Sequence, residues 1–256
     1  MSSTKPRAQL PELRPARDRP NVFYGDITAT DPHFRAALRR LMDAGAKRFC
    51  DIGGGGRPVV KLPELAEHEL DYVVFDASQS QLDRTPAGYQ LFLGDVLEAD
   101  SVSRFVREHG SFDAVVTRWT AEHMPDGRRF HEHVYSILRP GGTAVHHFPT
   151  LYSLPFVVNR LLSEDISKAL HARAAADSAN KFPAYYSWCR GPTARQLQRI
   201  ESLGYSIERY VGYFGHGWYA RVPPLHAAHR AAARWLLEHP MPSLTSFALA
   251  VLERPA

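Results

Sequence analysis

The sequence predicts an α/β fold with a mostly parallel sheet that carries helices on both faces. From residue 48 onward, short β-branched and aromatic runs alternate with segments of helical spacing. The first run leads directly into four consecutive glycines, as a tight strand-to-helix turn does. Two further strands are expected late in the chain, at 205–211 and 246–252. Repeated strand–helix units of this kind imply parallel strands joined by crossover helices.

The expected elements follow one another along the chain. A helix is expected to begin with Asp31 as N-cap before Pro32 and to end near Gly45. The remaining strands are expected at 48–52, 72–76, 89–93, 114–117 and 143–148, and the helices between them at 58–69, 101–109 and 127–138. The alternation ends near residue 149.

The length of 256 residues suits one α/β domain with additions. Residues 1–22 are rich in proline and poor in large apolar side chains, so they are expected to form a flexible tail. A single domain is expected over 23–256, with a substrate lid at about 149–195 and a helical insertion at about 212–243. The second insertion is longer than a hairpin loop and is expected to hold a helix at 225–238.

The composition argues against several classes of partner. The net charge is +4, but most of the excess lies in the first 20 residues, so no basic surface for nucleic acid is expected. No stretch approaches the length of a membrane span, and the N-terminus lacks a secretory signal, so a cytoplasmic location is expected. Cys50 and Cys189 have no metal-binding spacing, so no metal site is expected. The oligomeric state stays open.

A ligand site is expected at the carboxyl ends of the first two strands. Residues 51–56 read Asp-Ile-Gly-Gly-Gly-Gly, and Asp76 closes the next strand about twenty residues later. A carboxylate at that place accepts hydrogen bonds from both ribose hydroxyls of an adenosine. Pro58 replaces the last glycine of a dinucleotide fingerprint, which disfavours nicotinamide cofactors. The alternatives are a βα turn without a ligand and an Asp76 that caps the next helix.

On these residues the chain resembles the class I S-adenosylmethionine-dependent methyltransferases of small-molecule type, over about residues 45–150. Later segments continue the resemblance in the family's order: Gly94-Asp95-Val96, the stretch 112–123, and Leu138-Arg139-Pro140-Gly141-Gly142. The resemblance implies a Rossmann-like fold whose seven-stranded sheet ends on an antiparallel strand. It also implies S-adenosyl-L-methionine as cofactor, with S-adenosyl-L-homocysteine as product.

The resemblance also implies which residues hold the cofactor. The glycines and Asp51 of the first motif face its methionine part, Asp76 its ribose, and Asp95 with Val96 its adenine. Phe23 and Tyr24 either close over the cofactor or pack against the first helix. The cofactor-binding candidates are Tyr24, Asp51, Gly53, Gly54, Gly55, Asp76, Ala77, Ser78, Asp95, Val96 and Arg118.

The catalytic candidates are histidines, because an acceptor hydroxyl or amine must lose a proton and imidazole titrates near neutrality. Strand alternation puts His146 and His147 on opposite faces, and His147 is the favoured base. His123 is the second candidate, although in the family this position can simply shape the cofactor wall. Glu122 either orients His123 or caps a helix.

The acceptor is expected to be a small apolar or aromatic molecule. Motifs typical of DNA-base and protein-arginine methyltransferases are absent after the fourth expected strand. The segment 148–190 holds six aromatic residues, among them the substrate candidates Tyr152, Tyr185 and Tyr186, which either line a lid or pack as core. Competing hypotheses are a catalytically silent cofactor-binding or adaptor domain and a relative that uses the same cofactor, or another nucleotide, differently.

Overall fold

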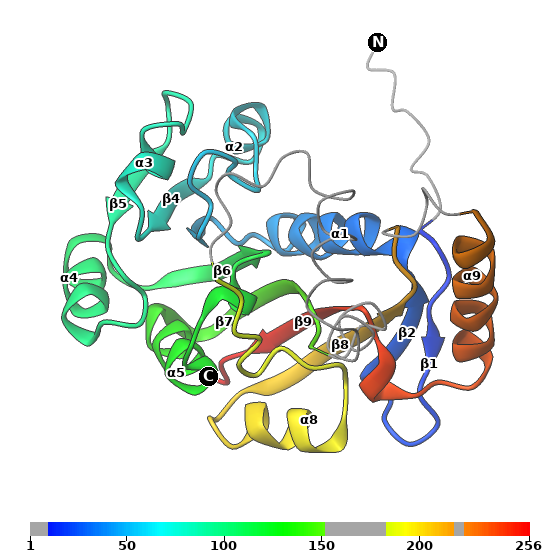
Figure 1. The fold of residues 1–256 in the computed structure, drawn as a ribbon. Coiled ribbons are helices and arrows are strands. Elements are labelled where there is room, and N and C mark those ends of the chain that lie inside the picture. The colour runs from blue at the N-terminus through cyan, green and yellow to red at the C-terminus, as the bar shows by residue number, and fades with distance from the viewer. Residues whose placement is uncertain (1–9, 152–182, 218–222) are drawn as a thin grey trace, which may run out of the picture.

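The computed structural model of the chain describes residues 10–151, 183–217 and 223–256. They form one nine-stranded sheet in the order β1-β2-β8-β9-β7-β6-β3-β4-β5 (Figure 1). The strands are β1 Arg14–Pro15, β2 Val22–Asp26, β3 Arg48–Ile52, β4 Asp71–Asp76, β5 Gln90–Leu93, β6 Phe112–Arg118, β7 Leu138–Pro149, β8 Ser206–Phe214 and β9 Phe247–Glu253. From β7 to β5 all strands are parallel, whereas β9 is antiparallel to β7 and β8. The predicted α/β fold and its antiparallel last strand are confirmed.

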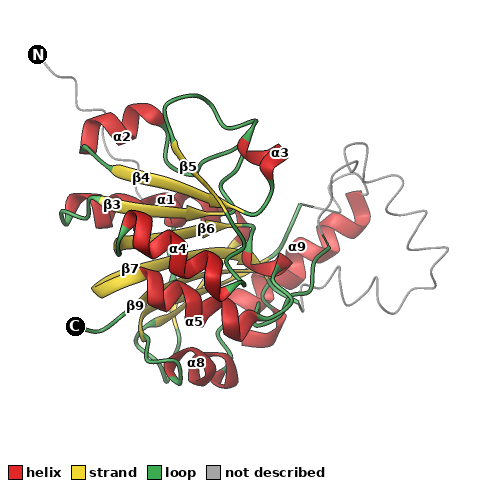
Figure 2. Cartoon of the chain, turned by 90° about the vertical axis from the view of Figure 1, so that its left-hand side faces the viewer, coloured by secondary structure: helices red, strands yellow, loops and turns green. Residues whose placement is uncertain are grey.

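Helices cover both faces of the sheet (Figure 2). They are α1 Thr30–Asp43, α2 Leu62–His68, α3 Gln79–Leu82, α4 Ala99–His109, α5 Gly127–Ile137, α8 Ala194–Glu201 and α9 Pro223–Glu238. One apolar cluster lies between the sheet and α1 to α3, and a second lies between the opposite face and α4, α5 and α8. Both faces of the central strands are therefore buried, which explains why their sequences are continuous apolar runs.

Two short strands at the N-terminus were not expected. The flexible-tail prediction is wrong for residues 14–22, because β2 pairs in parallel with β8 and β1 pairs with β2. Asn21 also donates a side-chain hydrogen bond to the Ile207 carbonyl oxygen at 2.8 Å. The outer edge of β8 offers backbone partners that the composition of this segment cannot reveal. The sheet thus has nine strands rather than seven, and residues 1–9 lie outside the described part.

Two helix starts differ from expectation. The N-cap of α1 is Ala29 rather than Asp31, whose carboxylate pairs instead with Arg118 Nη2 at 2.7 Å. The second helix begins at Leu62 rather than near residue 58, because the backbone N–H of Val59 donates to the Asp51 side chain and holds the chain in a loop.

The two late insertions have different outcomes. Helix α9 falls in the expected insertion, whereas most of the proposed lid, including Tyr152, lies outside the described residues. Helix α8 was not expected. Within the described ranges, no helix is long and apolar enough to cross a membrane.

Four phenylalanines form the centre of the core beside β4 and β5. The Phe105 ring of α4 is fully buried and lies 4.7 Å from the ring of Phe75, 4.9 Å from Phe92 and 5.2 Å from Phe112, between centroids. These contacts dock α4 onto strands whose carboxyl ends hold the candidate site.

We predict that Phe105→Ala lowers the free energy of unfolding by about 3–5 kcal/mol, because it removes a fully buried ring and leaves a cavity. Urea denaturation monitored by circular dichroism measures this. The matched control Arg107→Ala, an exposed residue of the same helix, should change stability by less than about 0.5 kcal/mol. Equal effects of the two substitutions would contradict the proposed packing role.

Candidate functional site

A cavity of about 470 Å³ lies at the carboxyl ends of β3, β4, β5 and β6. This edge is where parallel α/β sheets bind ligands, and the volume is that of a small-molecule site. Several residues proposed from sequence come together here: Gly53, Gly55, Asp76, Ala77, Ser78, Asp95, Val96, His123 and Tyr185. The cavity therefore gathers residues that are distant in the chain but lie at the same sheet edge.

The glycine turn after β3 forms the floor of the cavity. Gly53 has φ +76°, and a Cβ there would lie 2.4 Å from the Thr120 side chain. A Cβ on Gly55 would lie 2.6 Å from Asp76 Oδ2. Only residues without a side chain allow the turn to approach these two neighbours, and the backbone N–H of Gly53 donates to the Phe75 carbonyl oxygen at 2.8 Å.

Asp51 lies beneath the turn and does not line the cavity. Its buried carboxylate accepts hydrogen bonds from Val59 N at 2.8 Å and Tyr72 Oη at 2.6 Å. Burial raises its pKa to about 6, despite the opposing effect of these two bonds. Buried Gly54 packs on it, since a Cβ there would lie 2.3 Å from Asp51 Oδ2. The family resemblance implies that Asp51 contacts the cofactor. In the structure its carboxylate instead holds the loop after β3 through the hydrogen bond from Val59 N.

Asp76 is held at the rim of the cavity by two backbone groups. Gly55 N donates to its Oδ2 at 3.0 Å and Ser78 N donates to its Oδ1 at 2.9 Å. Each carboxylate oxygen retains a lone pair for a further donor. Asp95 is fixed in a similar way, since Leu97 N donates to its Oδ1 at 2.8 Å. Asp76 ends β4 and Asp95 follows the neighbouring strand β5, and both line one cavity.

His123 lies on the opposite wall, at the end of the 3-10 helix Ala121–His123. Its Nδ1 is 3.0 Å from the carbonyl oxygen of Pro183. Because a carbonyl oxygen only accepts, Nδ1 carries the proton and Nε2 is the basic nitrogen of the neutral ring. The Pro183 contact therefore sets the tautomer of His123.

Glu122 lies behind His123 and is only 5% exposed. Its Oε1 is 3.9 Å from His123 Nε2, which is beyond hydrogen-bonding distance. Burial raises the pKa of the carboxyl to about 8. Its backbone carbonyl oxygen accepts hydrogen bonds from Tyr185 N at 2.8 Å and Tyr186 N at 2.9 Å. Glu122 thereby joins the segment after residue 183 to the cavity wall.

The sequence reasoning missed Trp119, which lines the cavity and is 54% exposed. Its backbone has φ +57°, and its ring faces the Arg118 guanidinium, whose carbon lies 5.0 Å from the ring centroid. A large aromatic side chain immediately after a strand end was the available signal. Other lining residues that were not singled out are Gln81, Leu97, Thr120, Met124 and Pro183.

The structure places His147 away from the cavity. Its side chain is 2% exposed and lies between Phe34 and Phe247, at centroid distances of 5.5 and 5.7 Å. Burial lowers its pKa to about 4. His146 packs on the other face, 2.9 Å from Thr117 Oγ1, so the predicted alternation is confirmed. Neither histidine of β7 lines the cavity.

Three further candidates also lie elsewhere. Arg118 points toward α1, where it pairs with Asp31. Tyr24 stacks on Phe214 at a centroid distance of 5.7 Å and lines a different cavity. Tyr186 packs half-buried against the core.

The comparisons with known proteins agree with the geometry of the cavity. A family model described as "Methyltransferase domain" matches residues 19–207, well over half of the chain. Among curated protein sequences, none matches the chain.

Solved structures resemble the fold at low sequence identity. A SAM-dependent methyltransferase from Archaeoglobus fulgidus has a TM-score of 0.50 at 15% identity, over 88% of this chain and 95% of that one. An S-adenosylmethionine-dependent methyltransferase from Mesorhizobium loti has 0.50 at 19%, over 87% and 96%. The [4+2]-cyclase SpnF has 0.52 at 15%, over 90% and 83%. These likenesses confirm the Rossmann-like fold, and the family match shows that the chain belongs to the methyltransferase-domain family.

Proposed function

We propose that the chain transfers a methyl group from S-adenosyl-L-methionine to the hydroxyl or amine of a small apolar or aromatic molecule, releasing S-adenosyl-L-homocysteine. The observation that carries this proposal is the cavity in which a glycine turn meets the fixed carboxylate of Asp76. Family membership supports the reaction class. A cytoplasmic location stays a prediction from the sequence.

The lining residues fit the cofactor's parts. The two oxygens of Asp76 suit the ribose hydroxyls, Asp95 suits an adenine amino group, and the apolar side chain of Val96 lies beside it. Gly53 and Gly55 line the remaining space, where a Cβ would collide with Thr120 or with Asp76. When bound, this cofactor supplies an electrophilic methyl group for an in-line displacement.

His123 suits the task of general base. It lines the cavity, and its Nδ1 hydrogen bond to Pro183 makes Nε2 the basic nitrogen of the neutral ring. Sequence reasoning favoured His147, but that ring is buried under α1. We therefore propose His123 for this role. The buried carboxyl of Glu122 lies next to it, 3.9 Å from Nε2.

The apolar side chains at the cavity mouth suit an aromatic acceptor. Trp119, Met124 and Tyr185 line the same cavity as the two acidic side chains, and Trp119 and Tyr185 are exposed. Aromatic and thioether surfaces exclude water from a displacement reaction and orient a flat molecule. Tyr152 stays a prediction because it lies outside the described residues.

The first experiment tests cofactor binding by calorimetry with S-adenosylhomocysteine. Asp76→Ala removes two charged hydrogen bonds, so we expect affinity to fall by about 1.5–3 kcal/mol per bond, or roughly 10-fold to 100-fold for each. The control Asp100→Ala, an exposed aspartate at the start of α4, should bind normally. Unchanged affinity in Asp76→Ala, or no binding by the unaltered protein, would overturn the cofactor assignment.

A second experiment compares two histidines in a turnover assay. His123→Gln should lower turnover ~10²-fold or more while cofactor affinity stays nearly constant, because only the proton acceptor is lost. His147→Leu should retain turnover, since the side chain packs between Phe34 and Phe247 and does not line the cavity. The reverse result would return the role to His147. A chain that binds cofactor but methylates none of a broad acceptor panel would instead favour a silent domain.

The third prediction concerns Glu122 and pH. Burial raises the pKa of the Glu122 carboxyl to about 8, from the usual 4.5 for glutamate, so the folded chain keeps this carboxyl protonated over most of that range. Between those values the folded state binds more protons than the unfolded state, so this group's contribution to stability falls as pH rises, by up to ~1.4 kcal/mol per pH unit. Above pH 8 the contribution is lost.

Glu122→Gln cannot titrate, so its free energy of unfolding should lack this component. Urea denaturation at pH 5, 6, 7 and 8 measures both proteins. We expect the stability of the unaltered protein relative to Glu122→Gln to decrease steadily over this range. Parallel pH profiles for the two proteins would show that Glu122 titrates normally.

A further inference from the structure

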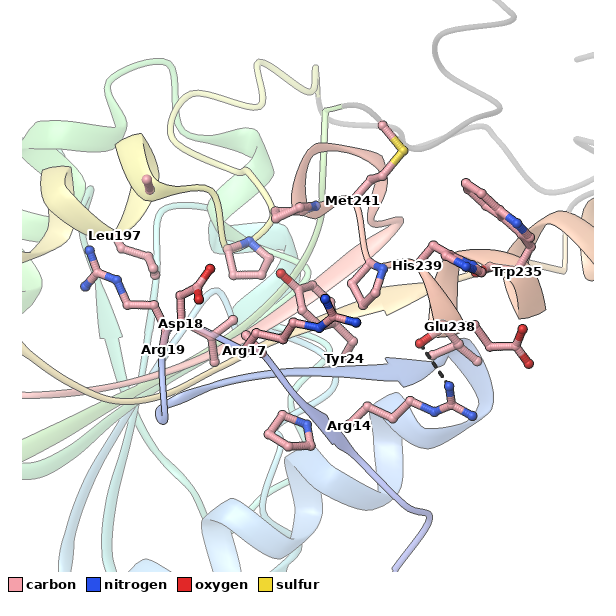
Figure 3. A pocket seen from close by; sticks show the side chains of 18 residues that line it. Arg14, Arg17, Asp18, Arg19, Tyr24, Leu197, Trp235, Glu238, His239 and Met241 are labelled. Carbon is pink, nitrogen blue, oxygen red and sulfur yellow. Dashed lines mark hydrogen bonds between the residues drawn. The ribbon is translucent and has the colours of Figure 1, made fainter.

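A second cavity of about 780 Å³ lies at the opposite edge of the sheet (Figure 3). Residues 14–19 and β2 form one side, and the end of α9 with the turn that follows it forms the other. None of its lining residues lines the candidate methyl-transfer site. Its size is that of a small-molecule site, and the proposed function leaves it unassigned.

The wall contributed by α9 and its following turn is apolar and aromatic. Trp235 is 52% exposed, and its ring stacks on His239 at a centroid distance of 4.7 Å. Met241, also exposed, follows in the same turn (Figure 3). Large apolar side chains that gather around a hollow and remain open to solvent are typical of ligand-binding surfaces.

The side contributed by residues 14–19 is cationic. Arg14 donates to the Leu237 carbonyl oxygen at 3.2 Å and so ties this segment to α9. Arg19 pairs with Glu201 at 3.4 Å. Arg17 has no ion pair or hydrogen bond with any residue in the described ranges, although it lines the cavity. Arg17 is therefore the guanidinium best placed to meet a bound anion.

Tyr24 supplies a hydroxyl group to the same cavity. The residue is 4% exposed and its ring stacks on Phe214, while its hydroxyl makes no hydrogen bond to a residue that the structure describes. Burial raises its pKa to about 12, so the hydroxyl stays protonated and acts as a donor. Figure 3 shows the Tyr24 ring and Arg17 among the lining side chains. The hydroxyl can therefore donate a hydrogen bond to an acceptor bound in the cavity.

We propose that this cavity binds a small aromatic acid. Its ring would pack against the apolar side formed by Trp235 and Met241, and its anionic group would accept hydrogen bonds from Tyr24 Oη and the Arg17 guanidinium. An anion is favoured over a cation because the lining contains three arginines and two acidic residues, Asp18 and Glu238. The acidic side chain of Glu238 points away from Tyr24 in Figure 3.

The test uses two fluorescent probes of nearly equal shape. 8-Anilinonaphthalene-1-sulfonate is an aromatic anion, and N-phenyl-1-naphthylamine is its uncharged counterpart. Titrations are run with the full chain in the presence and absence of saturating S-adenosylhomocysteine, so that binding in the methyl-transfer cavity is recognised by its displacement. We expect saturable binding of the sulfonate that the nucleoside does not displace.

Three variants locate the binding. Arg17→Glu should weaken sulfonate binding ~10-fold or more, and Tyr24→Phe ~3-fold or more, because each removes a donor to the anion. Trp235→Ala should weaken both probes. Arg107→Glu, an equal charge change on exposed α4 at the other end of the sheet, should leave both affinities unchanged. Melting temperatures of all variants check that each is folded.

Three results would overturn the proposal. The first is the absence of saturable sulfonate binding, as expected if a second copy of the chain or another segment covers the cavity. The second is equal weakening by Arg17→Glu and Arg107→Glu, which would mean attraction to net charge alone. The third is an equal loss of affinity for both probes in Arg17→Glu, which would show that the site does not require an anion and would exclude the proposed ligand class.

Discussion

The buried carboxylate of Asp51 is the constraint on which the candidate site depends. It joins β3 to the end of the following loop through Val59 N and to β4 through the Tyr72 hydroxyl. These bonds hold the glycine turn in an open loop and delay α2 until Leu62. The turn then lies close enough for Gly55 N to reach Asp76. A charged group is costly to bury, so its two strong donors define one conformation for this loop.

Burial also separates the chain's histidines by their possible roles. His146 and His147 lie in a central strand, where loss of solvation lowers their pKa values and apolar rings surround them. His123 lies one strand away, at a sheet edge where a cavity opens and a backbone carbonyl fixes its tautomer. Position relative to the strand end, rather than residue type, decides which imidazole can exchange a proton with a ligand.

The N-terminal segment adds two strands, β1 and β2, to the sheet beyond β8. By pairing with β8 it completes the edge of the sheet, and with α9 it encloses the second cavity. The two cavities therefore lie on opposite sides of the central strands. A ligand in the second one would contact β2 and α9 without touching the glycine turn, which gives the domain two separate recognition surfaces.

The sequence by itself determined the alternating strands and helices and the meeting of the glycine turn with Asp76, because these follow from local periodicity and from the shared edge of parallel strands. The antiparallel last strand was implied by the family resemblance. The tertiary structure decided the rest. Tyr24 lies at the far edge because β2 pairs with β8, and His147 is covered because α1 packs over β7. Such positions depend on contacts between segments more than a hundred residues apart, which no local pattern encodes.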